Sequence, residues 1–98
     1  MVNATVDNSP VSITLSSGES TSVPSGEVWN VTMYIASGSD GSNSDTGVEI
    51  NGRQFYEGRA DFNRYDGITV ETTLTGGDTI TCSFDNTSCH IGGFVVNN

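Results

Sequence analysis

The sequence predicts a single all-β domain, an antiparallel β-sandwich of about eight strands, and three observations support this fold class. Thr, Ser, Gly, Asn and Val dominate the composition, whereas Ala, Leu, Lys and Glu are sparse, which favours strands and turns over helices. Turn-forming groups interrupt the chain about every ten residues, a spacing typical of sandwiches and barrels. Because the chain has 98 residues, we expect residues 1–98 to form one domain around one core.

The clearest predicted strand covers residues 28–36, where apolar and polar side chains alternate. Its inward face is expected to carry Trp29, Val31, Met33 and Ile35. The same alternation predicts strands over residues 11–15 and 68–74, the latter with Ile68 facing inward, and a weaker first strand over residues 2–6. Small and turn-forming residues at 16–18 and 24–26 separate these segments.

Asn51-Gly52 is the strongest local signal, because both residues accept the positive φ that a two-residue type I′ turn requires. A tight hairpin around this turn would pair Val48 with Phe55 and Glu49 with Gln54. Apolar residues would then face apolar residues, and polar would face polar, which supports the hairpin independently.

Gly76-Gly77 marks a less regular connection. A two-residue turn there would place Ile80 on the wrong face, so we expect a β-bulge or a chain that crosses between the two sheets. Crossing would make the sandwich a jelly roll. The segment 37–46 is rich in Ser, Gly, Asp and Asn and is predicted to be a mobile, exposed loop that buries nothing.

The two cysteines of the chain are seven positions apart, and a two-residue turn at residues 85–86 would place Cys82 directly opposite Cys89. This spacing predicts a cross-strand disulfide, which would stabilise the edge of a small domain. Two buried free thiols are the alternative. Zinc is less favoured, because Cys82, Cys89 and His90 supply at most three ligands in no recognised spacing.

The charge pattern is unusual, because the chain contains no lysine and has a formal net charge of -9. All three basic residues are arginines, Arg53, Arg59 and Arg64, against twelve carboxylates. At about 1 M salt the Debye length is only about 3 Å, so such a surface costs little in self-repulsion and indicates a halophilic protein. It also argues against nucleic acid as a partner. No apolar run is long enough to span a membrane.

Residues that could carry chemistry do not form a recognisable catalytic pattern, so we expect no enzyme activity. Asp40 and Asp45 are interpreted as solvated carboxylates rather than a cation site, and we expect neither a metal nor a cofactor. Asn3, Asn30 and Asn86 begin N-glycosylation acceptor patterns, which we expect to be unused because Met1 is not followed by a signal-peptide pattern.

The segment 57–66 concentrates arginines, aromatic residues and carboxylates in a turn-rich connection. Arginine and aromatic residues are enriched in protein interfaces. The candidate interface residues are Arg59, Phe62, Arg64 and Tyr65. In the alternative interpretation, Phe62 or Tyr65 covers the core while the charges pair at the surface.

Three segments together resemble small jelly-roll domains of tailed-virus structural proteins: VPSGEVWNV at 23–31, VEING at 48–52 and TLTGGDTI at 73–80. The resemblance covers roughly residues 20–84 and consists of turn and strand motifs, so it concerns architecture more than role. Combined with the lysine-free acidity, the chain looks like a virion surface protein of a tailed virus of halophilic archaea. Such domains build head decorations and fibres.

The resemblance implies a capsid decoration or turret subunit at the virion surface, synthesised in the host cytoplasm and acting without catalysis. It implies a homo-oligomer, with a trimer favoured, seated on the major capsid protein or other virion proteins. The alternatives are a tail, baseplate or fibre component that binds the host surface, and a carbohydrate-binding module of a secreted halophilic protein. In that module Trp29, Tyr56 and Tyr65 would stack on sugar, although Trp29 is predicted to face inward.

Overall fold

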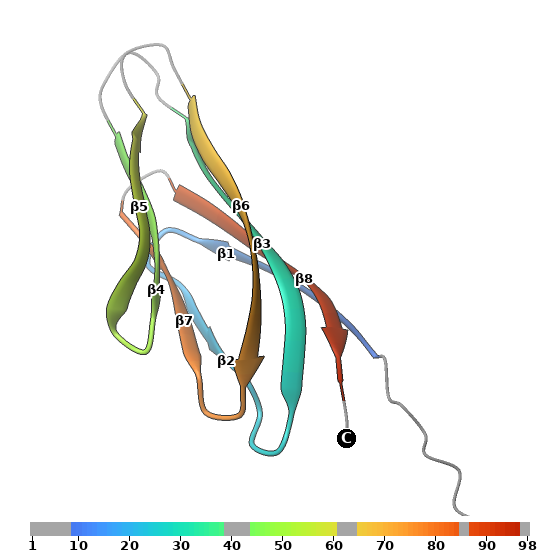
Figure 1. Ribbon diagram of the computed structural model, residues 1–98. Coiled ribbons are helices and arrows are strands. Elements are labelled where there is room, and N and C mark those ends of the chain that lie inside the picture. Colours follow the sequence, from blue (N-terminus) through green and yellow to red (C-terminus); the bar gives the residue numbers. More distant parts are fainter. Residues whose placement is uncertain (1–8, 39–43, 61–64, 85–86, 97–98) are drawn as a thin grey trace, which may run out of the picture.

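The computed structural model describes residues 9–38, 44–60, 65–84 and 87–96, with only the backbone described for residues 37, 38, 44, 45, 59, 60, 65 and 66. These residues form eight strands and no helix (Figure 1). The strands are β1 (Pro10–Ser16), β2 (Ser20–Ser22), β3 (Val28–Gly38), β4 (Ser44–Ile50), β5 (Arg53–Ala60), β6 (Tyr65–Thr75), β7 (Thr79–Ser83) and β8 (Thr87–Val95). The predicted all-β class is confirmed.

The strands form two antiparallel sheets of four, in the orders β1-β8-β3-β6 and β2-β7-β4-β5. Strands at equal distances in sequence from the Asn51–Gly52 turn pair with each other, as in one long folded hairpin. These pairs are β4·β5, β3·β6, β2·β7 and β1·β8. For paired residues such as Ser16 and Ser88, or Val28 and Thr75, the midpoint in the sequence lies close to that turn. Two packed sheets with this nested pairing form a jelly roll.

The hairpin between β4 and β5 has the predicted turn but only part of the predicted register. Positive φ angles of 56° at Asn51 and 78° at Gly52 fit a type I′ turn, and Glu49 faces Gln54 as expected. Val48 faces Tyr56, however, and not Phe55, because the register shifts at a bulge between Val48 and Glu49.

Gln54 stabilises this bulge, and the bulge decides which aromatic residue meets the core. The Gln54 amide donates to the carbonyl oxygen of Tyr56 at 2.6 Å and to that of Val48 at 3.3 Å. Tyr56 packs against the core as a result, whereas the extra residue Phe55 remains 45% exposed. The predicted pairing of Val48 with Phe55 is therefore wrong.

The connection at Gly76–Gly77 carries the chain from β6 in one sheet to β7 in the other, which confirms the predicted crossing. Gly77 has a φ of 92°. A methyl group on Gly76 would lie 2.9 Å from both the Pro24 carbonyl oxygen and the Gly26 amide nitrogen, so the two turns pack directly against each other. Glycine is required at both positions, for conformation at one and for space at the other.

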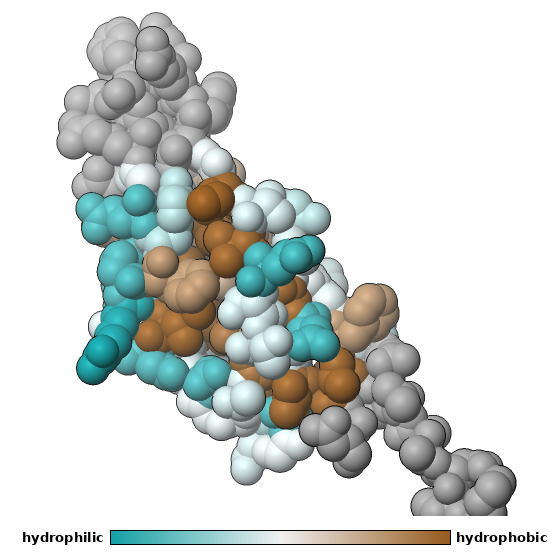
Figure 2. All heavy atoms as spheres, in the orientation of Figure 1, coloured by the Kyte–Doolittle hydropathy of each residue, from teal (hydrophilic) through white to brown (hydrophobic). Residues whose placement is uncertain are grey.

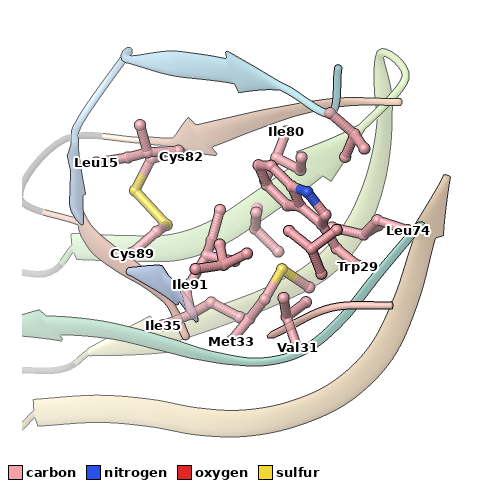
Figure 3. Close-up of a cluster of buried hydrophobic side chains, with 14 residues drawn as sticks. Leu15, Trp29, Val31, Met33, Ile35, Leu74, Ile80, Cys82, Cys89 and Ile91 are labelled. Atoms are coloured by element: carbon pink, nitrogen blue, oxygen red, sulfur yellow. A yellow bond between two sulfur atoms is a disulfide. The ribbon is translucent and has the colours of Figure 1, made fainter. Parts of the chain in front are cut away.

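The core lies between the sheets and includes all four side chains predicted to face inward from β3 (Figure 3). Met33 and Ile91 are completely buried, and the indole Nε1 of Trp29 donates to Glu27 Oε1 at 2.9 Å. Ile68 lies opposite Ile35 on the inward face of its sheet but is 36% exposed, because β6 is an edge strand.

Segment 37–46 departs from its prediction as an exposed loop. Residues 37–38 belong to β3, residues 44–46 belong to β4, and Thr46 is completely buried. The flanking strands thus extend into a segment whose composition is that of a loop, because pairing with β5 and β6 supplies backbone hydrogen bonds that composition does not reveal. Residues 39–43, including Asp40, and the predicted first strand at 2–6 lie outside the described residues.

Cys82 and Cys89 form the predicted disulfide, with their Cα atoms 5.8 Å apart, but not in the predicted place. Cys82 lies in β7 opposite Val48, and Cys89 lies in β8 between Leu15 and Ile35. Because β7 and β8 belong to different sheets, the bond crosses the core and joins the two layers (Figure 3). The expectation of directly opposed partners at the edge of the domain is wrong.

Candidate functional site

One end of the sandwich, the lower end in Figure 1, brings together the turns of three separate sequence segments. Gly77 donates its amide to the Val23 carbonyl oxygen at 2.9 Å, and the amide of Asn51 donates to the Thr79 carbonyl oxygen at 2.8 Å. The turns at 23–27, 51–52 and 76–78 therefore form one hydrogen-bonded cluster, which we call the turn end.

Asp78 is the centre of the turn end. The side-chain amide of Asn51 donates to one carboxylate oxygen at 2.9 Å, and the backbone amide of Thr75 donates to the other at 2.8 Å. These bonds, that of Asn51 first, lower the pKa of Asp78 below its ordinary value of 3.8 because they favour the charged form. Both carboxylate oxygens accept hydrogen bonds from neighbouring turns of the same fold, so we interpret the turn end as structural.

A groove of about 430 Å³ lies on the outer face of the β1-β8-β3-β6 sheet. It crosses three adjacent strands. Its outward-facing lining residues are Asn30 and Thr32 on β3, Glu71 and Thr73 on β6, and Gly92 and Phe94 on β8. These residues form two neighbouring cross-strand rows, Phe94–Asn30–Thr73 and Gly92–Thr32–Glu71.

Gly92 forms the floor of the groove because it has no side chain. Along β8, Phe94 stands on one side of this floor and is 53% exposed, and His90 stands on the other. His90 Nδ1 lies 3.0 Å from Thr14 Oγ1, and the His90 ring is 6.2 Å, centre to centre, from that of Tyr34, which is 52% exposed. Phe94 therefore borders the groove, whereas the His90 and Tyr34 rings lie beyond Gly92, outside the residues that line it.

Among the residues that line the groove, only Asn30 was considered as a candidate site from the sequence, as the start of an N-glycosylation acceptor pattern. A signal was present in Gly92-Gly93, because glycine inside a strand often marks a site where another group approaches closely. The structural surroundings of the two glycines differ. Gly93 faces inward, where a methyl group would overlap the Asn30 carbonyl oxygen. A methyl group on Gly92 would have the His90 ring as its nearest neighbour, at 3.4 Å, and would overlap nothing.

The predicted interface residues lie around the connection between β5 and β6. Arg59 and Tyr65 belong to these strands by their backbones, opposite Asp45 and Gly38, whereas Phe62 and Arg64 lie outside the described residues. β5 and β6 are edge strands of opposite sheets and contact each other along one side of the sandwich (Figure 1).

This side of the sandwich, which we call the β5–β6 side, exposes apolar surface. Phe55 on β5 and Ile68 on β6 are exposed, by 45% and 36% of their residue surface. Figure 2 shows hydrophobic atoms at the surface beside the hydrophilic flank formed by β4 and β5.

The described part of the chain offers little support for other classes of site. No group of three or more His, Cys, Asp or Glu residues there could hold a metal ion, and no helix there could cross a membrane. Trp29 is buried, as predicted, and Tyr56 is partly buried, so two of the three aromatic residues considered for sugar stacking do not form an open platform.

Comparison of the sequence with models of known protein families found no family that matches, and comparison with curated proteins found no matching sequence.

Proposed function

We propose that this protein is a non-catalytic virion structural protein, a homo-oligomeric subunit that decorates and stabilises the capsid of a tailed virus of halophilic archaea. The observation that carries this proposal is the β5–β6 side. Exposed Phe55 and Ile68 lie there on two edge strands, and the backbones of Arg59 and Tyr65 belong to the same two strands, next to the connection between them. Exposed apolar residues on strands whose sequence also carries arginine and aromatic residues have the composition of a subunit contact.

The internal construction of the domain also suits a shell component. The disulfide joins both sheets through the core, and the turn end joins three connections by hydrogen bonds. A particle component must resist unfolding without metabolic repair, and both features oppose opening of the sandwich. In a symmetric assembly the same modest contact is repeated at each subunit, which makes the whole assembly durable.

The lysine-free, acidic surface supports the halophilic part of the proposal. With a net charge of -9, subunits would repel one another in dilute solution, whereas molar salt screens this repulsion and leaves apolar contacts effective. Assembly through Phe55 and Ile68 should therefore strengthen as the salt concentration rises.

Light scattering coupled to size-exclusion chromatography in about 2 M KCl tests the assembly. We expect an oligomer, with Phe55→Ala and the double variant Arg64→Ala/Tyr65→Ala shifting it toward the monomer while the thermal midpoint changes little, because exposed side chains contribute little to the core. Phe94→Ala is the matched control, since it removes a ring of similar exposure from the opposite sheet and should leave the oligomer intact.

Co-sedimentation with purified tailed virus particles of halophilic archaea tests the location. Binding to particles stripped of this protein supports a capsid or tail role, and labelling in electron micrographs separates the two. A wild-type protein that stays monomeric at high concentration and does not bind particles would refute the proposal.

A further inference from the structure

Going beyond the proposed function, we propose that the groove on the outer face of the β1-β8-β3-β6 sheet binds a neutral saccharide, with one sugar ring lying over Gly92 against Phe94. The argument rests on the shape of the groove, on its hydrogen-bonding groups and on its charge.

The shape fits a single sugar ring. Two rows of side chains are separated by two residues along a strand, so His90 and Phe94 are about 13 Å apart along β8, with Gly92 midway between them. The groove of about 430 Å³ falls in the range of about 300–1,000 Å³ found for small-molecule sites. The missing side chain at Gly92 leaves an open floor beside Phe94, with the His90 ring 3.4 Å from the position that a Gly92 methyl group would take. The exposed face of Phe94 offers an apolar surface to the C–H groups of a sugar.

The polar groups of the groove match neighbouring hydroxyl groups of a sugar. The Thr73 hydroxyl donates to Asn30 Oδ1 at 2.9 Å, which orients the amide so that Nδ2 can donate to a ligand. In the next row, the Glu71 carboxylate can accept hydrogen bonds, beside the hydroxyl of Thr32. An amide donor next to a carboxylate acceptor can bind two adjacent hydroxyl groups, each of which both donates and accepts.

The charge of the groove selects a neutral ligand over an anionic one. Glu71 is the only charged residue among those that line it, and the whole chain carries a net charge of -9. Phosphate groups and uronic acids would be repelled. Stacking and hydrogen bonds, in contrast to ion pairs, are not weakened by the screening that molar salt produces, so this mode of binding suits a halophilic protein.

Chemical-shift changes in ¹⁵N–¹H NMR spectra of the whole chain provide the test, with methyl glycosides of glucose, galactose, mannose and N-acetylglucosamine as probes. We expect at least one to bind with a Kd on the order of millimolar, as is usual for a ligand of this size, and to shift the amides of Thr32, Gly92 and Gly93. Methyl glucuronide, which has the same ring with a carboxylate, is expected to bind at least tenfold more weakly than methyl glucoside.

Three variants localise the binding. Phe94→Ala and Glu71→Gln should each weaken it at least fivefold, and Gly92→Leu should abolish it by filling the floor. Phe55→Ala is the matched control, because it removes an exposed aromatic ring from the other sheet and should leave the affinity unchanged. Since Phe94→Ala and Phe55→Ala have opposite expected effects on sugar binding and on assembly, failure of either proposal is visible separately.

Several outcomes would overturn the inference: no shift with any of the four glycosides at 50 mM, shifts confined to residues outside the groove, or equal binding of the glucuronide. Amides of Gly92 and Gly93 that shift with protein concentration alone would instead identify the groove as a contact between copies of this chain, and that result would also exclude a sugar site. If Phe94→Ala fails to fold, Glu71→Gln and Gly92→Leu decide the question.

Discussion

Breaking the disulfide that joins the two sheets should destabilise the protein by an amount that can be worked out from its position. Cys82 and Cys89 close a loop with a sequence separation of seven. The chain-entropy relation, ΔS ≈ −2.1 − 1.5R ln n cal/mol/K, gives about 2.4 kcal/mol near 25 °C for a loop of this length. Reduced wild-type protein, which keeps both sulfur atoms in the core, should lose about this much free energy of unfolding.

The double variant Cys82→Ala/Cys89→Ala should lose more than the reduced protein. Both cysteines are buried in the core, and each removed sulfur atom costs about as much as a buried methylene group, roughly 1 kcal/mol. The expected total is about 4 kcal/mol. For a domain of this size, the loop contribution alone lowers the thermal midpoint by roughly 10–20 °C.

Urea unfolding of the oxidised, reduced and double-alanine proteins at one salt concentration measures both contributions. Reduction of the folded protein should itself be slow, because the exposed fractions of Cys82 and Cys89 are 0% and 1% and a thiolate reductant cannot reach the bond until the sandwich opens. Dithiothreitol in guanidinium chloride is the control in which reduction is rapid. Equal midpoints for oxidised and reduced protein, or rapid reduction under native conditions, would refute the reasoning.

Three further predictions concern charge and packing. The thermal midpoint should rise between about 0.1 and 2 M KCl as self-repulsion is screened, and a flat or falling curve in a melting experiment would count against a halophilic surface. Because the pKa of Asp78 is lowered in the folded protein, its carboxylate stabilises the fold above the ordinary pKa, and this contribution is lost as the pH falls through the folded pKa. Between about pH 5 and pH 2 the wild type should therefore lose more stability than Asp78→Asn in urea titrations, and equal losses would contradict the role of its hydrogen bonds. Gly93→Ala should lower the free energy of unfolding by about 1–3 kcal/mol, since a methyl group would overlap the Asn30 carbonyl oxygen and lie 2.7 Å from Val31 Cα. Gly92→Ala on the same strand should be nearly neutral, and equal effects of the two variants would exclude close strand approach as the cause.

Local chemistry in the sequence was sufficient to predict the fold class, the inward face of β3 and the central turn. Alternation placed Trp29 and Met33 in the core because successive side chains of a strand point to opposite faces, whatever the partner strand is. Asn51-Gly52 determined its turn because few residue pairs accept two positive φ angles in succession. The presence of a disulfide also followed, since the chain contains only two cysteines and they are near each other.

The tertiary structure alone decided how these elements combine. Neither the placement of Cys82 and Cys89 in different sheets nor the bulge that turns Tyr56 inward has a local signal, because both depend on which distant strands pair. The groove has the same origin. Asn30, Glu71 and Phe94 are far apart in the sequence and become neighbours only because β8 and β6 pair with opposite edges of β3, so a binding surface arises from strand order that no short segment encodes.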